Sequence, residues 1–193
     1  MLKPRALLPG DRLAVVAPAS PFTREEFDEG VAELRKLGFE PVYDESVFAR
    51  NGYLAGPAAA RAAAVMAAWR DPSIAGLIAV RGGYGSVHVL PWLDVGTLRR
   101  TPKPFVGSSD LTSVLTHLST GCHIVCFHGP MLAGKLGRGD GGYDRDTFVR
   151  SLTSPTPIGE LAPPGLETIK SGEASGPLYG GTLTQLAASL GTP

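Results

Sequence analysis

Short, almost wholly apolar runs alternate along the chain with longer stretches of helical character. The apolar runs at residues 12–18, 74–80 and 104–107 have the composition of parallel strands that are buried on both faces. Between the first two runs lie residues 23–37, with apolar side chains at helical spacing, and residues 57–70, an alanine-rich stretch of high helix propensity. The alternation predicts an α/β fold: a doubly wound, mostly parallel sheet with helices on both faces.

The first helix carries its own start and stop signals. Thr23, followed three residues later by Glu26, matches a capping box, in which each side chain hydrogen-bonds the backbone of the other residue. The apolar face begins at Phe27, and Gly38 suits the left-handed turn that ends many helices. We expect a strand at residues 39–43 to complete a βαβ unit.

Later elements follow the same scheme. The pattern predicts helices at residues 87–90 and 111–118, with a connector leading from the first of them to the strand at 104–107, and a further strand at 122–127. Ligands of such sheets bind beyond the carboxyl ends of the strands. The loops that follow the strands are therefore the places where chemistry is expected.

The regular pattern fades after residue 134. Residues 135–172 are rich in Gly, Asp, Pro and Ser and show little periodicity, as a linker or a lid does. Residues 173–193 regain apolar residues at helical spacing, and this apolar face has no later partner. We expect an α/β domain at residues 1–134, then the linker or lid, then the start of an incomplete C-terminal domain.

Charge and composition narrow the class of partner. The 193 residues carry 18 Lys and Arg against 18 Asp and Glu, so the chain has no electrostatic footprint for nucleic acid or an anionic membrane. The N-terminus lacks the apolar segment of a signal peptide, and no run is long enough to span a bilayer. Cys122 and Cys126 suit buried free thiols better than a disulfide framework. We expect a cytoplasmic protein with a small-molecule or peptide partner.

The apolar run at 104–107 delivers two serines to the start of a helix. It ends at Gly107 and is followed by Ser108, Ser109 and Asp110. This order is typical of a nucleophile elbow, the sharp strand-to-helix turn that exposes a serine hydroxyl. On these residues alone, a capping role for Ser109 or Asp110 is the more common alternative. If Ser109 is the nucleophile, the backbone N–H of Asp110 is a natural donor to the oxyanion.

A glycine-rich loop follows the strand at 74–80. Residues 81–85 read Arg-Gly-Gly-Tyr-Gly, and the missing side chains let backbone amides approach a ligand closely. Gly83 is the preferred second oxyanion donor, with Gly82 and Gly85 as close alternatives. The loop could instead be a tight turn, and it matches neither a dinucleotide fingerprint nor a P-loop.

A general base for the serine is not evident. His117 and His123 fall in helix and strand patterns, and His88 is expected to be peripheral. His128, at a strand end, could approach the site, although hydrogen bonding to backbone is the more common role at such a position. No metal-ligand spacing occurs in the sequence, and we expect neither a metal nor a cofactor.

Several motifs together resemble the serine LD-carboxypeptidase family, which includes the microcin C self-immunity peptidases. They occur in the family's order along the whole chain: Leu8-Pro9-Gly10-Asp11, Gly52-Tyr53-Leu54-Ala55-Gly56, Arg81-Gly82-Gly83-Tyr84-Gly85, Gly107-Ser108-Ser109-Asp110, His128-Gly129-Pro130 and Gly180-Gly181-Thr182-Leu183.

The resemblance implies roles for several residues of the two central motifs. It makes Ser109 the nucleophile and forms the oxyanion hole from the Asp110 amide and a glycine amide of the loop at 81–85, for which Gly83 is the preferred residue. It places Arg81, Gly82 and Tyr84 against the substrate.

The resemblance also implies an activity. The family removes a terminal D-amino acid from murein-derived peptides in cytoplasmic peptidoglycan recycling, without a cofactor and usually as a homodimer, with a smaller β-rich C-terminal domain. Alternatives are the microcin branch, which cleaves an amide between a carboxyl group and a modified nucleotide, and a non-catalytic domain that binds a peptide or nucleotide.

The chain departs from the family pattern at three points. Ser108 stands where the family usually has Tyr, and Thr182 where it usually has Asn. The Glu and His of the family's triad lie further along than this sequence extends. We therefore expect a truncated form with little peptidase activity of its own.

Overall fold

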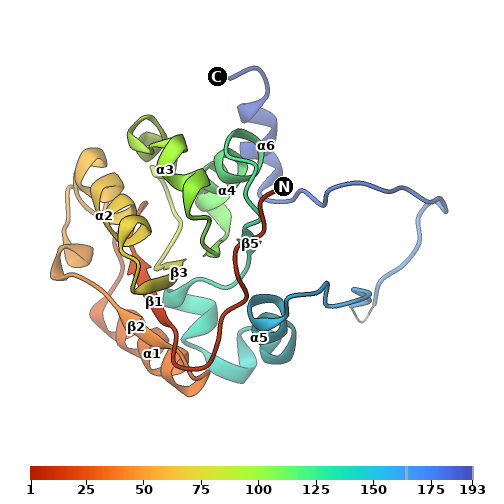
Figure 1. The fold of residues 1–193 in the computed structure, drawn as a ribbon, viewed down its shortest axis with the longest axis horizontal. Coiled ribbons are helices and arrows are strands. Elements are labelled where there is room, and N and C mark those ends of the chain that lie inside the picture. The colour runs from red at the N-terminus through yellow and green to blue at the C-terminus, as the bar shows by residue number, and fades with distance from the viewer. Residues whose placement is uncertain (164, 193) are drawn as a thin grey trace.

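Five parallel strands form a single sheet in the order β2-β1-β3-β4-β5 (Figure 1). They belong to a computed structural model, which describes residues 1–163 and 165–192. The strands are β1 (Arg12–Val16), β2 (Glu40–Val42), β3 (Ile74–Ala79), β4 (Phe105–Gly107) and β5 (Phe127–His128). The expected doubly wound α/β fold is confirmed.

Helices connect the strands and cover both faces of the sheet (Figure 1). The α-helices are α1 (Arg24–Lys36), α2 (Ala58–Arg70), α3 (Val95–Arg100), α4 (Thr112–Thr116), α5 (Arg145–Thr153) and α6 (Leu183–Ser189). The 3₁₀ helices are η1 (Glu45–Phe48), η2 (Ser86–Trp92), η3 (Ser109–Leu111) and η6 (Gly139–Gly141). The π-helical segments are η4 (His117–Gly121) and η5 (Leu132–Leu136).

The core consists of two apolar layers, one on each face of the sheet. Along β1, Leu13 and Val15 belong to the layer that contains the buried side chains of α1, whereas Ala14 and Val16 belong to the layer that contains those of α2. Successive side chains of a strand point to opposite faces. A strand that is buried on both sides must therefore be apolar at every position, which explains the continuous apolar runs.

Helix α1 begins where the capping box predicts. The Thr23 hydroxyl accepts a hydrogen bond from the Glu26 amide, and the Glu26 carboxylate accepts one from the Thr23 amide. The predicted face of α1 is buried, with Phe27 and Leu34 fully covered. Gly38 has a φ of +87° and ends the helical path as expected.

The strand order reverses between β1 and β3, which are neighbours although α1, β2 and α2 lie between them in the sequence. A reversal of this kind leaves a crevice at the carboxyl ends of the two strands. Residues 17–20 follow β1 there and residues 80–85 follow β3. The Ser20 amide donates to the carbonyl of Gly82 across this crevice, with an N···O distance of 3.1 Å.

The strand predicted at residues 122–127 is largely wrong. Only Phe127 joins the sheet, in β5. His123 adopts a left-handed conformation with a φ of 54°, which interrupts an extended path. Ile124 instead bridges to Leu2, so a contact with the N-terminal segment replaces the predicted strand.

Two helices occur where the sequence pattern predicts none. Asp94 caps α3 through a hydrogen bond to the Thr97 amide, within the stretch expected to be a connector. Helix α5 lies inside residues 135–172, and its buried Phe148 and Leu152 join the same core layer as α1. The expectation of little regular structure there is wrong for α5, while the division into domains stays a prediction.

A buried carboxylate attaches the segment around α5 to α1. Glu33 is only 2% exposed, and its carboxylate accepts hydrogen bonds from the Tyr143 hydroxyl at 2.8 Å and from Arg145 Nη2 at 2.5 Å. Burial opposes ionisation of Glu33, but these two hydrogen bonds and the positive charges of Arg145 and Lys36 together lower its pKa. Burial and the bond to Glu33 raise the pKa of Tyr143 to about 12.

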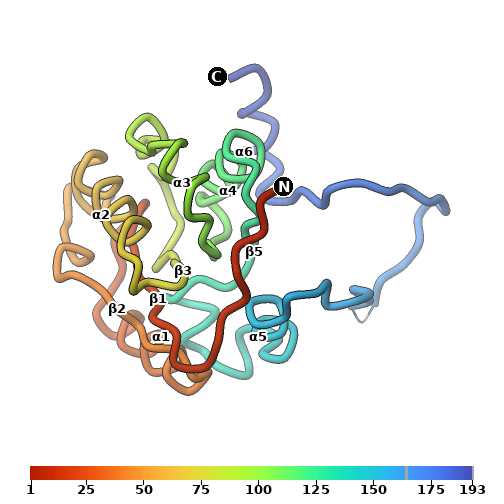
Figure 2. Tube along the Cα trace, viewed as in Figure 1, coloured from red at the N-terminus to blue at the C-terminus, as the bar shows by residue number. Residues whose placement is uncertain are grey.

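After α5 the chain runs outward before it returns at α6 (Figure 2). Apolar side chains along this path are exposed, including Ile169 and Leu178. Helix α6 packs against α4. A β-rich continuation stays a prediction. Within the part of the chain that the structure describes, no helix has the length and apolar character needed to cross a bilayer.

We expect Glu33→Gln to lower the free energy of unfolding by about 1–3 kcal/mol at neutral pH, because the Tyr143 hydroxyl and the Arg145 guanidinium lose a charged, buried acceptor. A depressed pKa in the folded state contributes stability above the unfolded pKa, and this contribution is lost as the pH falls through the folded value. The difference between the two proteins should therefore shrink in acid. Urea unfolding between pH 3 and pH 7 measures it.

Glu29→Gln is the matched control, because it makes the same change on an exposed position of α1. It should leave the unfolding midpoint within experimental error at every pH. An equal loss in both variants would contradict a special role for Glu33.

Candidate active site

The turn after β4 holds Ser109 in a conformation that non-glycine residues rarely adopt. Its φ is 56°, and the residue is exposed although its neighbours Asp110 and Leu111 are buried. A left-handed residue between a strand and a helix is the geometry of a nucleophile elbow. Such strain costs on the order of 1–3 kcal/mol and concentrates at functional sites.

The glycine loop after β3 touches this turn directly. A Cβ atom at Gly82 would lie 3.1 Å from the Cβ of Ser109, 3.2 Å from the Asp110 amide nitrogen and 3.3 Å from the Ser108 carbonyl oxygen. Any side chain at Gly82 would crowd the serine. The structure thus brings together two motifs that are 27 residues apart in the sequence.

Gly83 lies in close contact with the loop after β1. Its φ is +99°, and a Cβ atom there would lie 2.7 Å from the Cβ of Ser20. The Ser20 hydroxyl accepts a hydrogen bond from the Tyr84 amide at 3.0 Å. Within the described residues the Gly83 amide has no acceptor, so it is available to a ligand.

The Asp110 side chain holds the turn in place through hydrogen bonds to buried neighbours. It is 4% exposed, and its carboxylate accepts hydrogen bonds from the Ser86 amide at 2.8 Å and from Gln185 Nε2 at 2.9 Å. The Ser86 hydroxyl donates to the Asp110 carbonyl at 2.5 Å. The backbone N–H of Asp110 lies in the first helical turn, where backbone donors lack an intrahelical acceptor.

A second contact ties the turn to the segment before α6. The Thr112 hydroxyl donates to the Ser109 carbonyl at 2.6 Å and accepts from the Thr182 amide at 3.0 Å. Gly181 approaches so closely that a Cβ atom there would lie 2.8 Å from the Thr112 hydroxyl oxygen. The Gly-Gly-Thr motif therefore supports the elbow from a distant part of the sequence.

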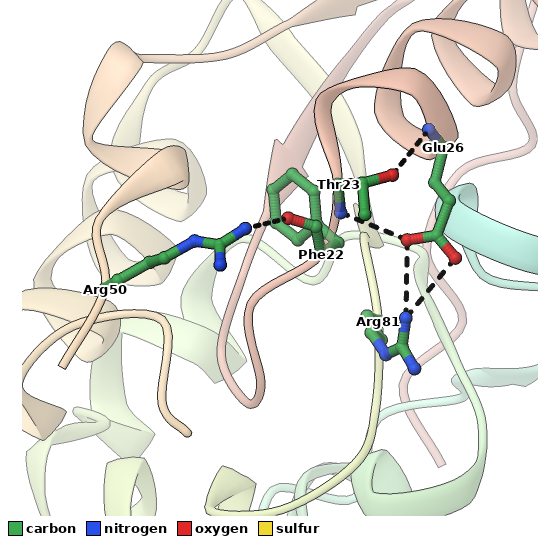
Figure 3. A network of polar contacts seen from close by, with 5 residues as sticks. All are labelled: Phe22, Thr23, Glu26, Arg50 and Arg81. Atoms are coloured by element: carbon green, nitrogen blue, oxygen red, sulfur yellow. Dashed lines mark hydrogen bonds and ion pairs between the residues drawn. The ribbon is translucent and has the colours of Figure 1, made fainter. Parts of the chain in front are cut away.

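Arg81 reaches from the loop after β3 to the first turn of α1 (Figure 3). Its Nη1 atom lies 3.4 Å from both carboxylate oxygens of Glu26, which also accepts from the Thr23 amide. The side chains of Arg81 and Glu26 are 46% and 35% exposed. Nearby, Arg50 donates to the Phe22 carbonyl and holds the loop before α1 (Figure 3). An exposed ion pair of this length contributes little stability.

Tyr84 belongs to a small aromatic cluster at the surface. Its ring meets those of Tyr53 and His88 edge to face, with centroids 5.6 Å and 5.5 Å apart. Half of Tyr84 is exposed. The ring is therefore accessible beside the glycine loop.

None of the four histidines hydrogen-bonds Ser109 within the described residues. His128 lines a groove of about 780 Å³ between α4, β5 and α5, and Ser109 does not line this groove. His117 lies at the end of α4, where burial lowers its pKa. The Ser109 hydroxyl has no hydrogen-bond partner in the part of the chain that the structure describes.

The structure thus assembles Ser109, Asp110, Gly82 and Gly83 and leaves Arg81 and Tyr84 at the rim. Sequence reasoning missed the supporting residues. Their signals were weak, except for Arg61, which occupies the buried face of an alanine-rich helix. These supporting residues are Ser20 after β1, Arg61 in α2, Ser86 in η2, Thr112 in α4 and Gln185 in α6.

Comparison with known protein families identifies the family to which the chain belongs. The family model for the N-terminal domain of LD-carboxypeptidases matches residues 13–129, which contain both the glycine loop and Ser109. The chain belongs to the LD-carboxypeptidase family. The resemblance inferred from its motifs is confirmed.

Relatives of known name lie in both branches of this family. A Streptomyces coelicolor protein named as a carboxypeptidase is 37% identical over 201 residues, which cover 100% of this chain and 63% of that protein. The murein tetrapeptide carboxypeptidase of Pseudomonas aeruginosa is 33% identical over 189 residues, which cover 94% of this chain and 61% of the enzyme.

A solved structure represents the microcin branch. The microcin C7 self-immunity protein MccF in complex with aspartyl sulfamoyl adenosine is 27% identical, with a TM-score of 0.74, and the match covers 79% of this chain and 47% of that one. The chain of this LD-carboxypeptidase family member spans less than two thirds of the length of its curated relatives.

Replacing Ser109 by Gly and by Ala tests whether the elbow is strained. Both variants lose the hydroxyl, but only Gly adopts a φ of 56° without steric strain. Relief of about 1–2 kcal/mol exceeds the advantage of about 0.4–1 kcal/mol that Ala gains over Gly from the unfolded chain. We expect Ser109→Gly to be the more stable variant in urea unfolding.

Ser113 provides the control, because it lies in the ordinary helical turn of α4. There the order should reverse, with the Ala variant about 1 kcal/mol more stable than the Gly variant. The same order at both positions would mean that the Ser109 turn is unstrained.

Proposed function

We propose that this chain carries the nucleophile and oxyanion hole of a serine-type LD-carboxypeptidase. The observation that carries the proposal is the exposed left-handed Ser109 directly beside Gly82. Each of the two neighbouring loops supplies one backbone N–H donor: Asp110 in the turn after β4 and Gly83 in the glycine loop after β3. Preorganised donors of this kind are often the largest single contribution to acyl transfer.

In the proposed reaction, the Ser109 hydroxyl oxygen attacks the carbonyl carbon of the terminal peptide bond. Negative charge then develops on the carbonyl oxygen, where the Asp110 and Gly83 amides donate hydrogen bonds. The terminal D-amino acid leaves as its nitrogen takes a proton, and water hydrolyses the resulting ester. A base must accept the serine proton. We propose that this base is the His of the family's triad, and that the triad's Glu and His lie outside residues 1–193.

The proposed substrate is a murein-derived peptide that ends in a D-amino acid. The name of the Pseudomonas aeruginosa relative supports this substrate class. Arg81 suits the free terminal carboxylate, because its guanidinium is half exposed and only its Nη1 atom contacts Glu26 in the described residues. Gly82 and Tyr84 complete the proposed contact surface.

A second candidate is cleavage of an aminoacyl-nucleotide amide. The ligand in the solved MccF structure is of this class. A non-catalytic domain that binds a peptide or nucleotide through the same crevice is a third. Binding of a tetrapeptide but not of an aminoacyl sulfamoyl adenosine, measured by isothermal titration calorimetry, would favour the first candidate over the second.

We also propose that the protein is cytoplasmic and forms a homodimer. Membership of the family supports both proposals. Sedimentation velocity at several protein concentrations tests the homodimer.

The chain by itself should hydrolyse an L,D-tetrapeptide with little or no turnover, because no base hydrogen-bonds the Ser109 hydroxyl within residues 1–163 and 165–192. Release of D-alanine, measured by a coupled oxidase assay, checks this expectation. A residual rate above the uncatalysed reaction would fit an oxyanion hole that acts alone.

Ser109→Ala is the companion variant. Normal turnover that this substitution abolishes would reveal a base among the described residues, with His128 the first suspect. Normal turnover that survives the substitution would refute Ser109 as the nucleophile.

Arg81→Gln should weaken binding of the same tetrapeptide about tenfold, the equivalent of about 1.4 kcal/mol, because the terminal carboxylate loses a charged donor. Isothermal titration calorimetry measures the affinity. Arg70→Gln removes an exposed arginine of α2 and should leave it unchanged. Glu26→Gln preserves the capping box and, by releasing Arg81, should not weaken binding.

A further inference from the structure

Helix α2 contains a charged side chain that is almost completely buried. Arg61, in the first half of α2, is 4% exposed and lies on the same helical face as Val65 and Trp69. Arginine is almost never fully buried unless it is paired. Within the described residues Arg61 forms no ion pair at contact distance, so its environment must be explained by other interactions.

The guanidinium donates to backbone carbonyls of three separate loops. Nε donates to Gly56 at 3.0 Å, in the loop before α2. Nη1 donates to Gly85 at 2.8 Å, in the glycine loop after β3, and also to Pro18, in the loop after β1. These three loops lie at the carboxyl edge of the sheet, where β1 and β3 form the crevice. A single side chain therefore fixes their relative positions.

Stability alone does not favour a guanidinium at this position. Burial lowers the pKa of Arg61, while the negative charge of Asp110 acts in the opposite direction. The Nη2 atom is buried without a partner in the described residues. A buried guanidinium without an ion pair incurs a desolvation cost, which its hydrogen bonds to the carbonyls of Gly56, Pro18 and Gly85 offset. The three carbonyl contacts therefore point to a role in placing the loops.

The contact with Gly85 leads directly to the elbow. Gly85 has a φ of +98° and precedes Ser86, whose amide and hydroxyl both bind Asp110. Asp110 follows Ser109 and carries one of the two proposed oxyanion donors. Movement of the Gly85 carbonyl would thus displace both the glycine loop and the support of the serine turn.

We propose that Arg61 is a positioning residue that sets the distance between the glycine loop and the Ser109 elbow. This inference rests on the proposed function, because the two loops are the proposed oxyanion hole. Arg61 itself does not touch the substrate. Its guanidinium acts through the Gly85 and Pro18 carbonyls, and its charge is balanced at a distance by Asp110.

Amide hydrogen exchange tests the proposal on the chain as it exists, without any need for turnover. Informative amides are those that close the crevice: Ser20, which donates to Gly82, and Tyr84, which donates to the Ser20 hydroxyl. The Ser86 amide, which donates to Asp110, reports on the elbow. Arg61→Met should raise the exchange rates of these three amides at least tenfold under native conditions.

The sheet supplies an internal reference. The Leu77 amide of β3 donates to Pro104 at 2.8 Å and should exchange at an unchanged rate. Arg70→Met, on the same helix but exposed, should leave all four rates unchanged. Arg61→Lys keeps the charge but cannot reach three carbonyls with the same planar fork, so it should raise the loop rates by a smaller factor and also serves if the Met variant fails to fold.

Two results would overturn the proposal. Unchanged exchange at Ser20, Tyr84 and Ser86 in both Arg61 variants would show that the loops hold their positions without it. A uniform increase that includes Leu77 would show that Arg61 acts on global stability. Neither result depends on whether Ser109 is the nucleophile, so the failure of this proposal is distinguishable from the failure of the proposed function.

Discussion

The buried carboxylate of Asp110 is the interaction on which the candidate site depends. It joins Ser86 at the start of η2 to Gln185 in α6, and its own backbone forms the turn that exposes Ser109. A buried carboxylate needs hydrogen-bond donors, because its desolvation is otherwise uncompensated. The need to supply those donors links segments that the sequence separates by 24 and 75 residues.

The site departs from the arrangement that stability alone would favour. Ser109 is left-handed, Gly82 and Gly83 exclude side chains, and Arg61 buries a guanidinium without a full set of partners. Each feature costs free energy, and each brings backbone groups of one loop close to another. The two apolar layers around β1 provide the stability that makes such departures tolerable. The well-packed sheet thus supports the strained loops at its carboxyl edge.

Sequence reasoning succeeded where the cause of a structure is local or repeats along the chain. The capping box at Thr23, the stop at Gly38 and the apolar runs of β1 and β3 all lie where the pattern predicts. It failed where a distant segment competes. The run at 122–127 looks like a strand, yet the N-terminal residues pair beside Ile124 and leave only a short β5.

The sequence by itself determined the layered α/β fold and the two motifs around Gly83 and Ser109, because apolar periodicity and turn chemistry depend on neighbouring residues. The family followed from the resemblance of its motifs and their order along the chain. Only the tertiary structure decided that Gly82 lies against Ser109, that Arg61 binds three loops and that α6 supports Asp110. The reason is physical. A hydrogen bond between distant segments depends on how the strands are ordered in the sheet, and that order is settled by packing both faces at once.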